Sequence, residues 1–420
     1  MTISGISASG HTVPALDANT EAVHRLFACQ PRLVAVESAL RAIPGMQRNQ
    51  ILTSGPTLPF ERYTGGQREA LLGAAIYEGY ATNRAEAERA YAAGEVVVSG
   101  CQQLGAVGSL AGVTTASMPV VVVEDPLTGD RAYCTLYEGD AADRLNYGKY
   151  TAATRENLDY LHDHVGPALG RAVQMCGGVE LKPIIARALT MGDELHSRNT
   201  AATTLFVREL LGVFADLSAD DARVLAGYLF TGDYFFLRLA MAAAKVMANT
   251  MRGVRGSSVV TAMAFSCAEF GVQVAGTGDQ WFRGPLPTFE ATKLNPGFTV
   301  DDMEFMGGES VITEVVGLGG VAQAAALPLQ RSSGGSAAAM IARTTQMYDI
   351  CVAEHPDFRI PVLDYRGTPV GFDVRAIAET GITPVLDIGI AGVGGGQIGG
   401  GVARAPLEPF VLAAEALARQ

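Results

Sequence analysis

Hydrophobic periodicity changes twice along this chain, and these changes limit the folds open to it. Between Thr151 and about Met251, apolar residues recur at helical spacing, which predicts a succession of amphipathic helices. On either side, short apolar runs such as 119–124 and 384–390 alternate with glycine-rich turns, a pattern typical of strands and loops. The sequence therefore predicts a mixed α/β, or α+β, multi-domain protein with a mostly helical middle region.

The length supports a division into parts. At 420 residues the chain is too long for one ordinary core, and about two to three domains are expected. The changes in periodicity predict a mixed α/β domain at 1–150, a mostly helical region at 151–252, and a mixed α/β domain with Gly-rich loops at 253–420.

Charge and cysteine usage narrow the function classes. The net charge of −12 and a pI of about 5.0 argue against nucleic acid as a partner, because a phosphate backbone requires a basic face. A small anion remains possible, since local amides and a few arginines can bind it. Residues 1–10 lack the pattern of a signal peptide, no apolar stretch is long enough for a membrane span, and the six cysteines form no C-x-x-C pair. We expect a cytoplasmic protein with free thiols.

The strongest local constellation lies at 191–199, between two apolar helices. Its polar residues are Asp193, Glu194, His196, Arg198 and Asn199. On a helix, Asp193 and His196 would share a face, and a carboxylate beside a histidine can orient it or set its pKa for proton transfer. The ordinary alternative is a helix terminus with solvated charges and caps. We predict no metal site, because the chain has only six histidines and no H-E-x-x-H motif.

A second constellation lies at 307–320, where a strand-like run meets a loop containing Gly317, Gly319 and Gly320. Backbone amides of a Gly-rich loop that opens a helix can bind an anion. Glu309 and Glu314 are close enough in sequence to be catalytic or to anchor this loop. A tight turn needed for close packing is the alternative interpretation.

A third glycine cluster at 388–401 contains a literal G-x-G-x-x-G from Gly394 through Gly396 to Gly399, with Gln397 inside it. No clear helix follows the third glycine, and the chain ends about where a ribose-binding acid should lie, so this is not a dinucleotide site. No cofactor is predicted. The hypothesis that remains is a flexible loop that binds a ligand through its backbone.

A fourth candidate lies at 363–373, after an apolar run that predicts a strand over 360–364. Arg366 and Thr368 follow in a turn, and loops at strand ends often carry binding residues. An arginine there is suited to a carboxylate or phosphate. A turn contact between Asp364 and Arg366 is an equally ordinary interpretation.

These loops and the segments around them resemble a known family, the oxamate carbamoyltransferase large subunits, grouped with AllG, YlbE and YahG-type proteins. The resembling segments cover most of the chain from about 15 to 407. They are 43–46, 72–79, 106–118, 121–124, 131–139, 191–210, 235–245, 256–263, 269–281, 312–320, 363–373 and 381–406. The chain departs from the family pattern as we know it at Gln102 and Gln103, where histidines are expected, and at Arg238, where an asparagine is expected.

The resemblance implies a mixed α+β fold and membership of a hetero-complex that acts late in anaerobic allantoin breakdown. There the carbamoyl group of oxalurate moves to phosphate, giving oxamate and carbamoyl phosphate. The implied companion subunits are an acyl-CoA-synthetase-like protein and a smaller subunit; a homo-oligomer is the alternative assembly. The resemblance supplies no catalytic residues, so the candidate site rests on residue chemistry.

The leading hypothesis is therefore a carbamoyltransferase-type subunit acting on a small ureide or amide carboxylate. We predict His196, Asp193, Glu194 and Glu314 as catalytic, with His196 giving a proton to the leaving nitrogen. The predicted substrate-binding residues are Arg198, Asn199, Arg366, Thr368, Gly317, Gly319, Gly320, Gly394, Gly396, Gln397 and Gly399. The alternatives are a stand-alone, metal-assisted amidohydrolase and a non-catalytic scaffold subunit.

Overall fold

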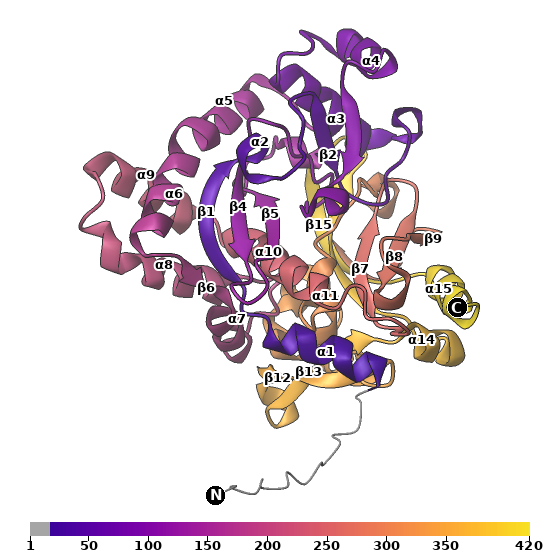
Figure 1. Ribbon diagram of the computed structural model, residues 1–420. Coiled ribbons are helices and arrows are strands. Elements are labelled where there is room, and N and C mark those ends of the chain that lie inside the picture. The colour runs from indigo at the N-terminus through magenta and orange to yellow at the C-terminus, as the bar shows by residue number, and fades with distance from the viewer. Residues whose placement is uncertain (1–16) are drawn as a thin grey trace, which may run out of the picture.

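The computed structural model describes residues 17–420, and these form a mixed α+β fold, as the sequence predicts (Figure 1). The predicted absence of a signal peptide at 1–10 lies outside the described residues. No helix among residues 17–420 has the length and apolar character needed to cross a membrane.

An antiparallel sheet with strand order β5-β4-β1-β6 organises the first part of the chain. Its strands are β1 (Arg32–Ser38), β4 (Pro119–Glu124), β5 (Arg131–Thr135) and β6 (Val179–Glu180). β4 and β5 form the predicted hairpin around the turn at 125–130. The other elements before residue 150 are α1 (Ala18–Ala28), α2 (Ala39–Ala42), α3 (Gly65–Tyr77), α4 (Arg84–Ala92), and the parallel pair β2 (Gln50–Thr53) and β3 (Val97–Gly100).

The middle of the chain is helical, as predicted. Its helices are α5 (Ala152–Tyr160), α6 (Gly166–Met175), α7 (Leu181–Thr190), α8 (Thr200–Phe214), α9 (Ala219–Thr231) and α10 (Phe235–Asn249). A π-helical turn at Leu161–Val165 joins α5 to α6, so the backbone stays helical from Ala152 to Met175, where a single helix is predicted over 151–175. Ser218 caps α9, as its sequence context predicts, by accepting a hydrogen bond from the amide of Asp221.

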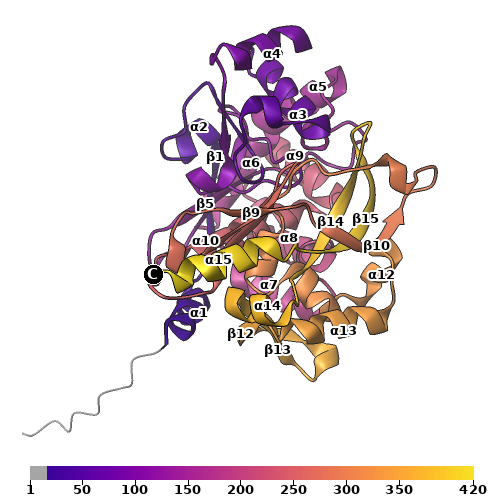
Figure 2. The same cartoon turned by 90° about the vertical axis from the view of Figure 1, so that its right-hand side faces the viewer.

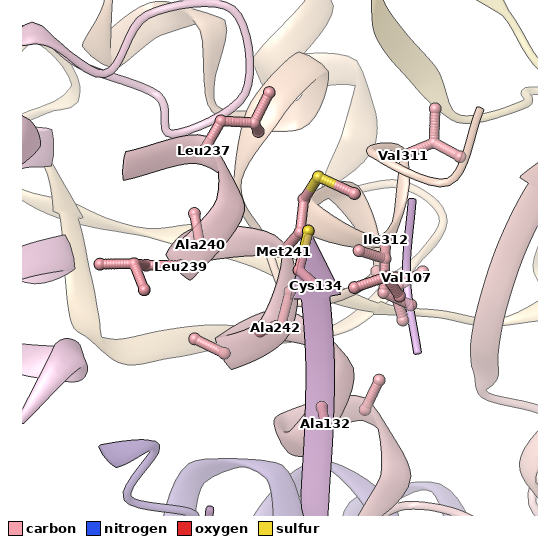
Figure 3. Close-up of a cluster of buried hydrophobic side chains, with 14 of the residues drawn as sticks. Val107, Ala132, Cys134, Leu237, Leu239, Ala240, Met241, Ala242, Val311 and Ile312 are labelled. Atoms are coloured by element: carbon pink, nitrogen blue, oxygen red, sulfur yellow. The ribbon is translucent and has the colours of Figure 1, made fainter. Parts of the chain in front are cut away.

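Helix α10 lies in the centre of the molecule, between the first sheet and the C-terminal elements (Figure 1). Every residue from Phe235 to Ala248 is buried, which fits a helix that is apolar on nearly all sides. Figure 3 shows its side chains against Cys134 of β5 and Ile312 of α11 (Ile312–Val315). Arg238 and Lys245 are its two buried cations. Packing of α10 in the core therefore holds Arg238 in a buried position, which the periodicity of the sequence alone does not predict.

Two antiparallel sheets follow α10. The first has the order β7-β8-β9, with β7 (Val260–Phe265), β8 (Phe270–Val274) and β9 (Phe282–Gly284). The second has the order β10-β15-β14-β11, with β10 (Thr288–Leu294), β11 (Met303–Glu304), β14 (Val385–Gly392) and β15 (Gln397–Arg404). Figure 2 shows β10, β14 and β15 beside α12 (Gln330–Ser333).

The remaining C-terminal elements cover these sheets and contact the start of the chain. They are α13 (Ala337–Met347), the hairpin of β12 (Cys351–Ile360) and β13 (Arg366–Phe372), α14 (Val374–Thr380) and α15 (Glu408–Ala418). Helix α1 packs against β12, so residues more than 300 positions apart in sequence lie side by side (Figure 1).

Several predicted elements are wrong in type or extent. The run 310–313 forms a buried turn leading into α11 instead of a strand, because a short apolar run between glycines fits either structure. The helix predicted over 336–354 ends at Met347, since Cys351 onward pairs with β13. The strand predicted over 360–364 is a 3₁₀ turn after β12. Asp17, and not Asn19 or Thr20, caps α1.

Candidate functional site

A pocket of about 500 Å³ opens where the segment after β5 (137–147), α10 and the β10-β15-β14 strands meet. Its lining includes one histidine, one carboxylate and four cations, which are His196, Asp140, Arg144, Arg238, Lys293 and Arg331. Four cations and one carboxylate therefore face this cavity besides the histidine, in a protein whose net charge is −12. Such a local excess of positive charge favours a small anion.

His196 is held at the pocket wall by a buried carboxylate from a distant part of the chain. Its Nδ1 lies 2.9 Å from Oε1 of Glu314, and the two side chains are 4% and 0% exposed. Because Nδ1 is engaged, Nε2 is the ring nitrogen left to reach a ligand. The structure thus joins the first and second constellations of the sequence into one pair.

The glycine-rich loop at 317–320 surrounds Glu314 itself. Oε1 of Glu314 accepts hydrogen bonds from the amides of Gly320, at 2.9 Å, and Asp387, at 3.1 Å, while Oε2 accepts one from the Thr313 hydroxyl at 2.9 Å. Gly319 has a φ of +61°, and a Cβ there would lie 2.6 Å from Oε1 of Glu314. The anion that these amides bind is therefore a carboxylate of the chain.

Two buried carboxylates, those of Glu314 and Asp387, favour the charged form of the His196 imidazole. Burial alone would lower the pKa of His196, but Glu314, through its charge and hydrogen bond, and Asp387 together raise it. Burial, with the nearby charge of Glu314, raises the pKa of Asp387. Burial and the charge of Asp387 raise the pKa of Glu194 against the effect of the amides that it accepts. The arrangement favours a protonated His196 that can donate from Nε2.

Glu194 and Asp193 shape the loop that carries His196 and do not face the pocket. Glu194 accepts hydrogen bonds from the amides of residues 196, 197 and 198. Oδ2 of Asp193 accepts from the amide of Ala202 at 2.8 Å, at the start of α8, and its Oδ1 lies 3.4 Å from Nε of Arg198. Burial raises the pKa of Asp193, opposed by these two contacts. Both carboxylates position the histidine loop.

Arg198 and Asn199 line a smaller cavity of about 170 Å³ next to the main pocket. The two cavities share Ser197, Tyr234 and Ser332 in their linings. Nε of Arg198 donates to the Gly192 carbonyl at 2.9 Å. The predicted binding pair therefore lies beside the His196 pocket and not in its lining.

The third constellation forms one wall of the main pocket. Gly389 of β14, Gly400 of β15 and Lys293 of β10 are register partners across three neighbouring strands, and all line the cavity. The two glycines form a floor that neighbouring groups approach closely, since a Cβ at Gly400 would lie 2.9 Å from the Ser332 carbonyl oxygen and one at Gly389 would lie 3.4 Å from Nε2 of Gln397. Gln397 accepts a hydrogen bond from the Tyr147 hydroxyl at 2.8 Å. Gln397 and Gly399 thus line the same pocket as His196, but they lie on strand β15 and not in a loop, and their binding of a ligand stays a prediction.

Other predicted residues lie elsewhere. Gly394 and Gly396 are in the turn of the β14–β15 hairpin, outside the described lining, and the Gly396 amide donates to the Tyr147 carbonyl at 2.8 Å. Arg366 is 44% exposed, pairs with Glu354 at 2.7 Å, and stacks on Tyr348. The hydroxyl of Thr368 is buried and faces the turn at Gly317, behind Glu314. Arg366 therefore does not belong to the His196 pocket.

Sequence reasoning missed the cations that give the pocket its charge. Arg144 and Arg238 come from a loop before α5 and from the buried helix α10, and Lys293 and Arg331 come from β10 and α12. Single cations spaced this far apart give no local motif. One signal was present: Arg238 stands in a 15-residue helix that is otherwise almost free of charge, and such a charge needs a reason.

The described residues offer no ready metal site. Within residues 17–420, no three His, Cys, Asp or Glu side chains gather as a group that could hold a metal ion. Asp193, Glu194 and His196 are close in sequence, but each carboxylate faces backbone amides of its own loop.

The α+β fold thus places a buried histidine–carboxylate pair in the wall of a pocket lined by four cations. Comparison with known proteins gives the family. The family model for the oxamate carbamoyltransferase subunit AllG matches residues 96–310. The oxamate carbamoyltransferase subunit AllG of Escherichia coli (strain K12) is 36% identical over 408 residues, covering 96% of this chain and 97% of that protein. The uncharacterized protein YahG of the same strain is 34% identical over 397 residues, covering 94% and 84%.

A solved structure agrees with these matches. The crystal structure of a conserved protein of unknown function from Enterococcus faecalis V583 matches with a TM-score of 0.92 at 35% identity, covering 96% of this chain and 97% of that chain. The chain therefore belongs to the family of the oxamate carbamoyltransferase subunit AllG.

Proposed function

We propose that this chain is the subunit of a carbamoyltransferase-type enzyme that binds a small ureide or amide carboxylate. The observation that carries the proposal is the buried His196–Glu314 pair in the wall of a pocket lined by four cations. The E. coli protein AllG, which is similar to this chain over nearly its full length, is named as a subunit of an oxamate carbamoyltransferase. The substrates would be oxalurate and phosphate, and the products oxamate and carbamoyl phosphate.

The residues of the pocket suit this reaction. Phosphate oxygen attacks the carbamoyl carbon, and the bond from that carbon to the amide nitrogen of oxalurate breaks. The departing nitrogen needs a proton, which His196 donates from Nε2, and the phosphate hydroxyl returns a proton to His196. The reaction thus leaves the imidazole unchanged. The arginines and Lys293 hold the negative charges of both substrates, and Glu314 keeps the imidazole protonated and oriented.

The test is turnover by the assembled enzyme. The chain is purified together with its companion subunits, proposed to be an acyl-CoA-synthetase-like protein and a smaller one, and supplied with oxalurate and phosphate. Carbamoyl phosphate should form, and His196→Gln should lower its rate about 10²- to 10⁴-fold, the usual contribution of a general acid. Arg366→Gln is the matched control, because Arg366 is an exposed, ion-paired residue outside the pocket.

Three outcomes would reject the proposal or part of it. No carbamoyl phosphate from any ureide, with all subunits present, would remove the transferase function. Hydrolysis of the amide by the chain alone, abolished by a chelator, would favour the metal-assisted amidohydrolase. Unchanged turnover in His196→Gln would leave this chain as a scaffold subunit.

A further inference from the structure

Arg238 carries a buried positive charge for which the described chain offers no counter-ion. Its side chain is 3% exposed, and its Nε and Nη1 atoms are buried without a hydrogen-bond partner among the described residues. The Cys134 thiol, which hydrogen-bonds the guanidinium, is held neutral by burial, which raises its pKa, and so supplies no counter-charge. A guanidinium stays charged in proteins, and leaving it unpaired in the interior is costly. Because Arg238 lines the pocket, a ligand can supply the missing partner.

A second arginine lies at the same end of the pocket. Arg144 is 7% exposed and stacks on Tyr147, with its guanidinium carbon 4.1 Å from the ring centre. Its Nη1 lies 3.4 Å from the hydroxyl of Tyr137, whose ring in turn lies 5.9 Å from the Arg238 guanidinium. Its Nε is also buried without a partner. Tyr137 therefore links two guanidinium groups that both have unused donors.

The charge of this end favours a monoanion. The groups that line the pocket at this end are two guanidinium cations and the carboxylate of Asp140, which accepts a hydrogen bond from the Tyr137 hydroxyl. The buried carboxylate of Glu138 lies near Tyr147 but does not line the pocket, and its oxygens accept hydrogen bonds from backbone amides. The pocket lining at this end therefore carries one positive charge in excess. Burial raises the pKa of Tyr137 and of Tyr147, so both phenols stay neutral donors. A planar guanidinium matches a planar carboxylate with two parallel hydrogen bonds.

We propose that Arg238 and Arg144 form the subsite for the carboxylate of the substrate, and that Arg238 determines the preference for a carboxylate over a neutral amide at that position. This assignment rests on the proposed function and deepens it. The opposite side of the glycine floor carries Lys293 and Arg331. Lys293 lies two strand spacings, or about 10 Å, from Gly389. A second anion such as phosphate can therefore bind without displacing the carboxylate from the arginine pair.

Ligand binding to the purified full-length chain, alone and with its companions, tests the assignment. The probes are oxamate, its neutral diamide oxamide, and inorganic phosphate, followed by calorimetry and by the shift in melting temperature. The wild-type chain should bind oxamate more tightly than oxamide. Arg238→Gln should weaken oxamate binding at least about 30-fold, the usual scale for a buried charge that loses its partner, and remove this preference. Phosphate binding should change little.

The free protein gives an independent readout. Removing an unpaired buried charge should leave the melting temperature of ligand-free Arg238→Gln equal to or above that of the wild type, whereas a purely structural arginine would lower it. Arg238→Lys keeps the charge and should recover part of the oxamate affinity. Arg366→Gln, which changes an exposed arginine paired with Glu354, is the control and should bind like the wild type.

Several results would overturn the assignment. They are no oxamate binding by the wild type in either form, unchanged oxamate affinity in Arg238→Gln, a loss of phosphate binding in place of oxamate binding, or a lowered melting temperature that Arg238→Lys does not correct. These results are separable from turnover. If oxamate binding depends on Arg238 but the complex forms no carbamoyl phosphate, the subsite stands and the proposed function fails.

Discussion

Replacing Glu314 by glutamine should remove the charge behind His196 while keeping its hydrogen bonds. Oε1 of Glu314 accepts from the His196 ring and from the amides of Gly320 and Asp387, and Oε2 accepts from the Thr313 hydroxyl. A glutamine can keep its oxygen toward the first three donors and turn its NH₂ group toward the Thr313 oxygen. The perturbation is therefore electrostatic, with little change in shape.

The magnitude follows from the burial of the pair. Opposite charges about 4 Å apart attract by about 4 kcal/mol at an effective dielectric constant of about 20, and neither side chain is exposed enough for water to screen this. The amides of Gly320 and Asp387 also donate to the Glu314 carboxylate and stabilise part of its charge. The variant should therefore lose about 2 to 4 kcal/mol of the attraction between Glu314 and His196. At a pH above the pKa of His196 in both the wild type and the variant, the protonated fraction of His196 should be about 30- to 1000-fold lower in the variant.

In Glu314→Gln, the contribution of His196 to the stability of the fold should depend on pH in the opposite direction. In the wild type, Glu314 and Asp387 raise the pKa of His196 above its usual value near 6.5. The pair therefore stabilises the fold fully below that value and loses this contribution as the pH rises through the folded pKa. In Glu314→Gln, burial should dominate and lower the pKa, so the histidine should destabilise the fold as the pH falls below about 6.5.

Two assays check this reasoning. An NMR titration of the His196 ring should move its midpoint from above the usual value to below it. The rate of the assembled enzyme should begin to fall at a lower pH, because the protonated imidazole is the proton donor. Glu354→Gln removes an exposed carboxylate that pairs with Arg366 and should leave both profiles unchanged. An unchanged midpoint in Glu314→Gln would refute the claim that Glu314 sets the charge of His196.

Two further predictions concern stability. A residue other than glycine in a left-handed conformation costs about 1–2 kcal/mol, and Gly319→Ala should lower the free energy of unfolding by more than this, because its Cβ would lie 2.6 Å from the Glu314 carboxylate. The control in chemical denaturation is Gly381→Ala, since Gly381 has a φ of +70° and open space around it. Equal losses in the two variants would contradict this account. Burial and then the charge of Arg252 lower the pKa of Lys245 to about 7, so the unfolded chain binds more protons and wild-type stability should gain from this group as the pH rises from about 7 to 10. Lys245→Met should be more stable at neutral pH, by about 1–4 kcal/mol, and its advantage should shrink over that range; a constant difference would show that Lys245 does not titrate there.

The sequence predicted the periodic elements well and the pairing of distant segments poorly. The strand β4 begins and ends at the predicted residues, and the helices from 152 to 249 follow their apolar spacing. The run 336–354 favours a single helix, yet Cys351 within it lies in a strand. Its pairing with Phe372 of β13 decides the structure, and no local pattern contains that contact.

The candidate site divides in the same way. His196 and Glu314 were each recognisable as polar groups in apolar surroundings, but their hydrogen bond joins positions 118 residues apart. The glycines at 317–320 were recognisable as an amide-rich loop. Their sequence could not tell whether the anion was a ligand or a side chain of the chain, because the backbone requirement is the same in both cases. Arg144 and Arg238 carried no motif.

Cations and carboxylates occupy opposite sides of the His196 ring. Arg144, Arg238 and Lys293 face the cavity, whereas Glu314 and Asp387 lie behind the imidazole in the core. Burial disfavours the proton on His196, and the carboxylates of Glu314 and Asp387 favour it. Under the proposed function, an anionic substrate bound beside the ring would add a negative charge to those of the two carboxylates and should strengthen the hold of His196 on its proton. In the proposed reaction, the charge that the arginines bind would thus also prepare the acid that the departing nitrogen needs.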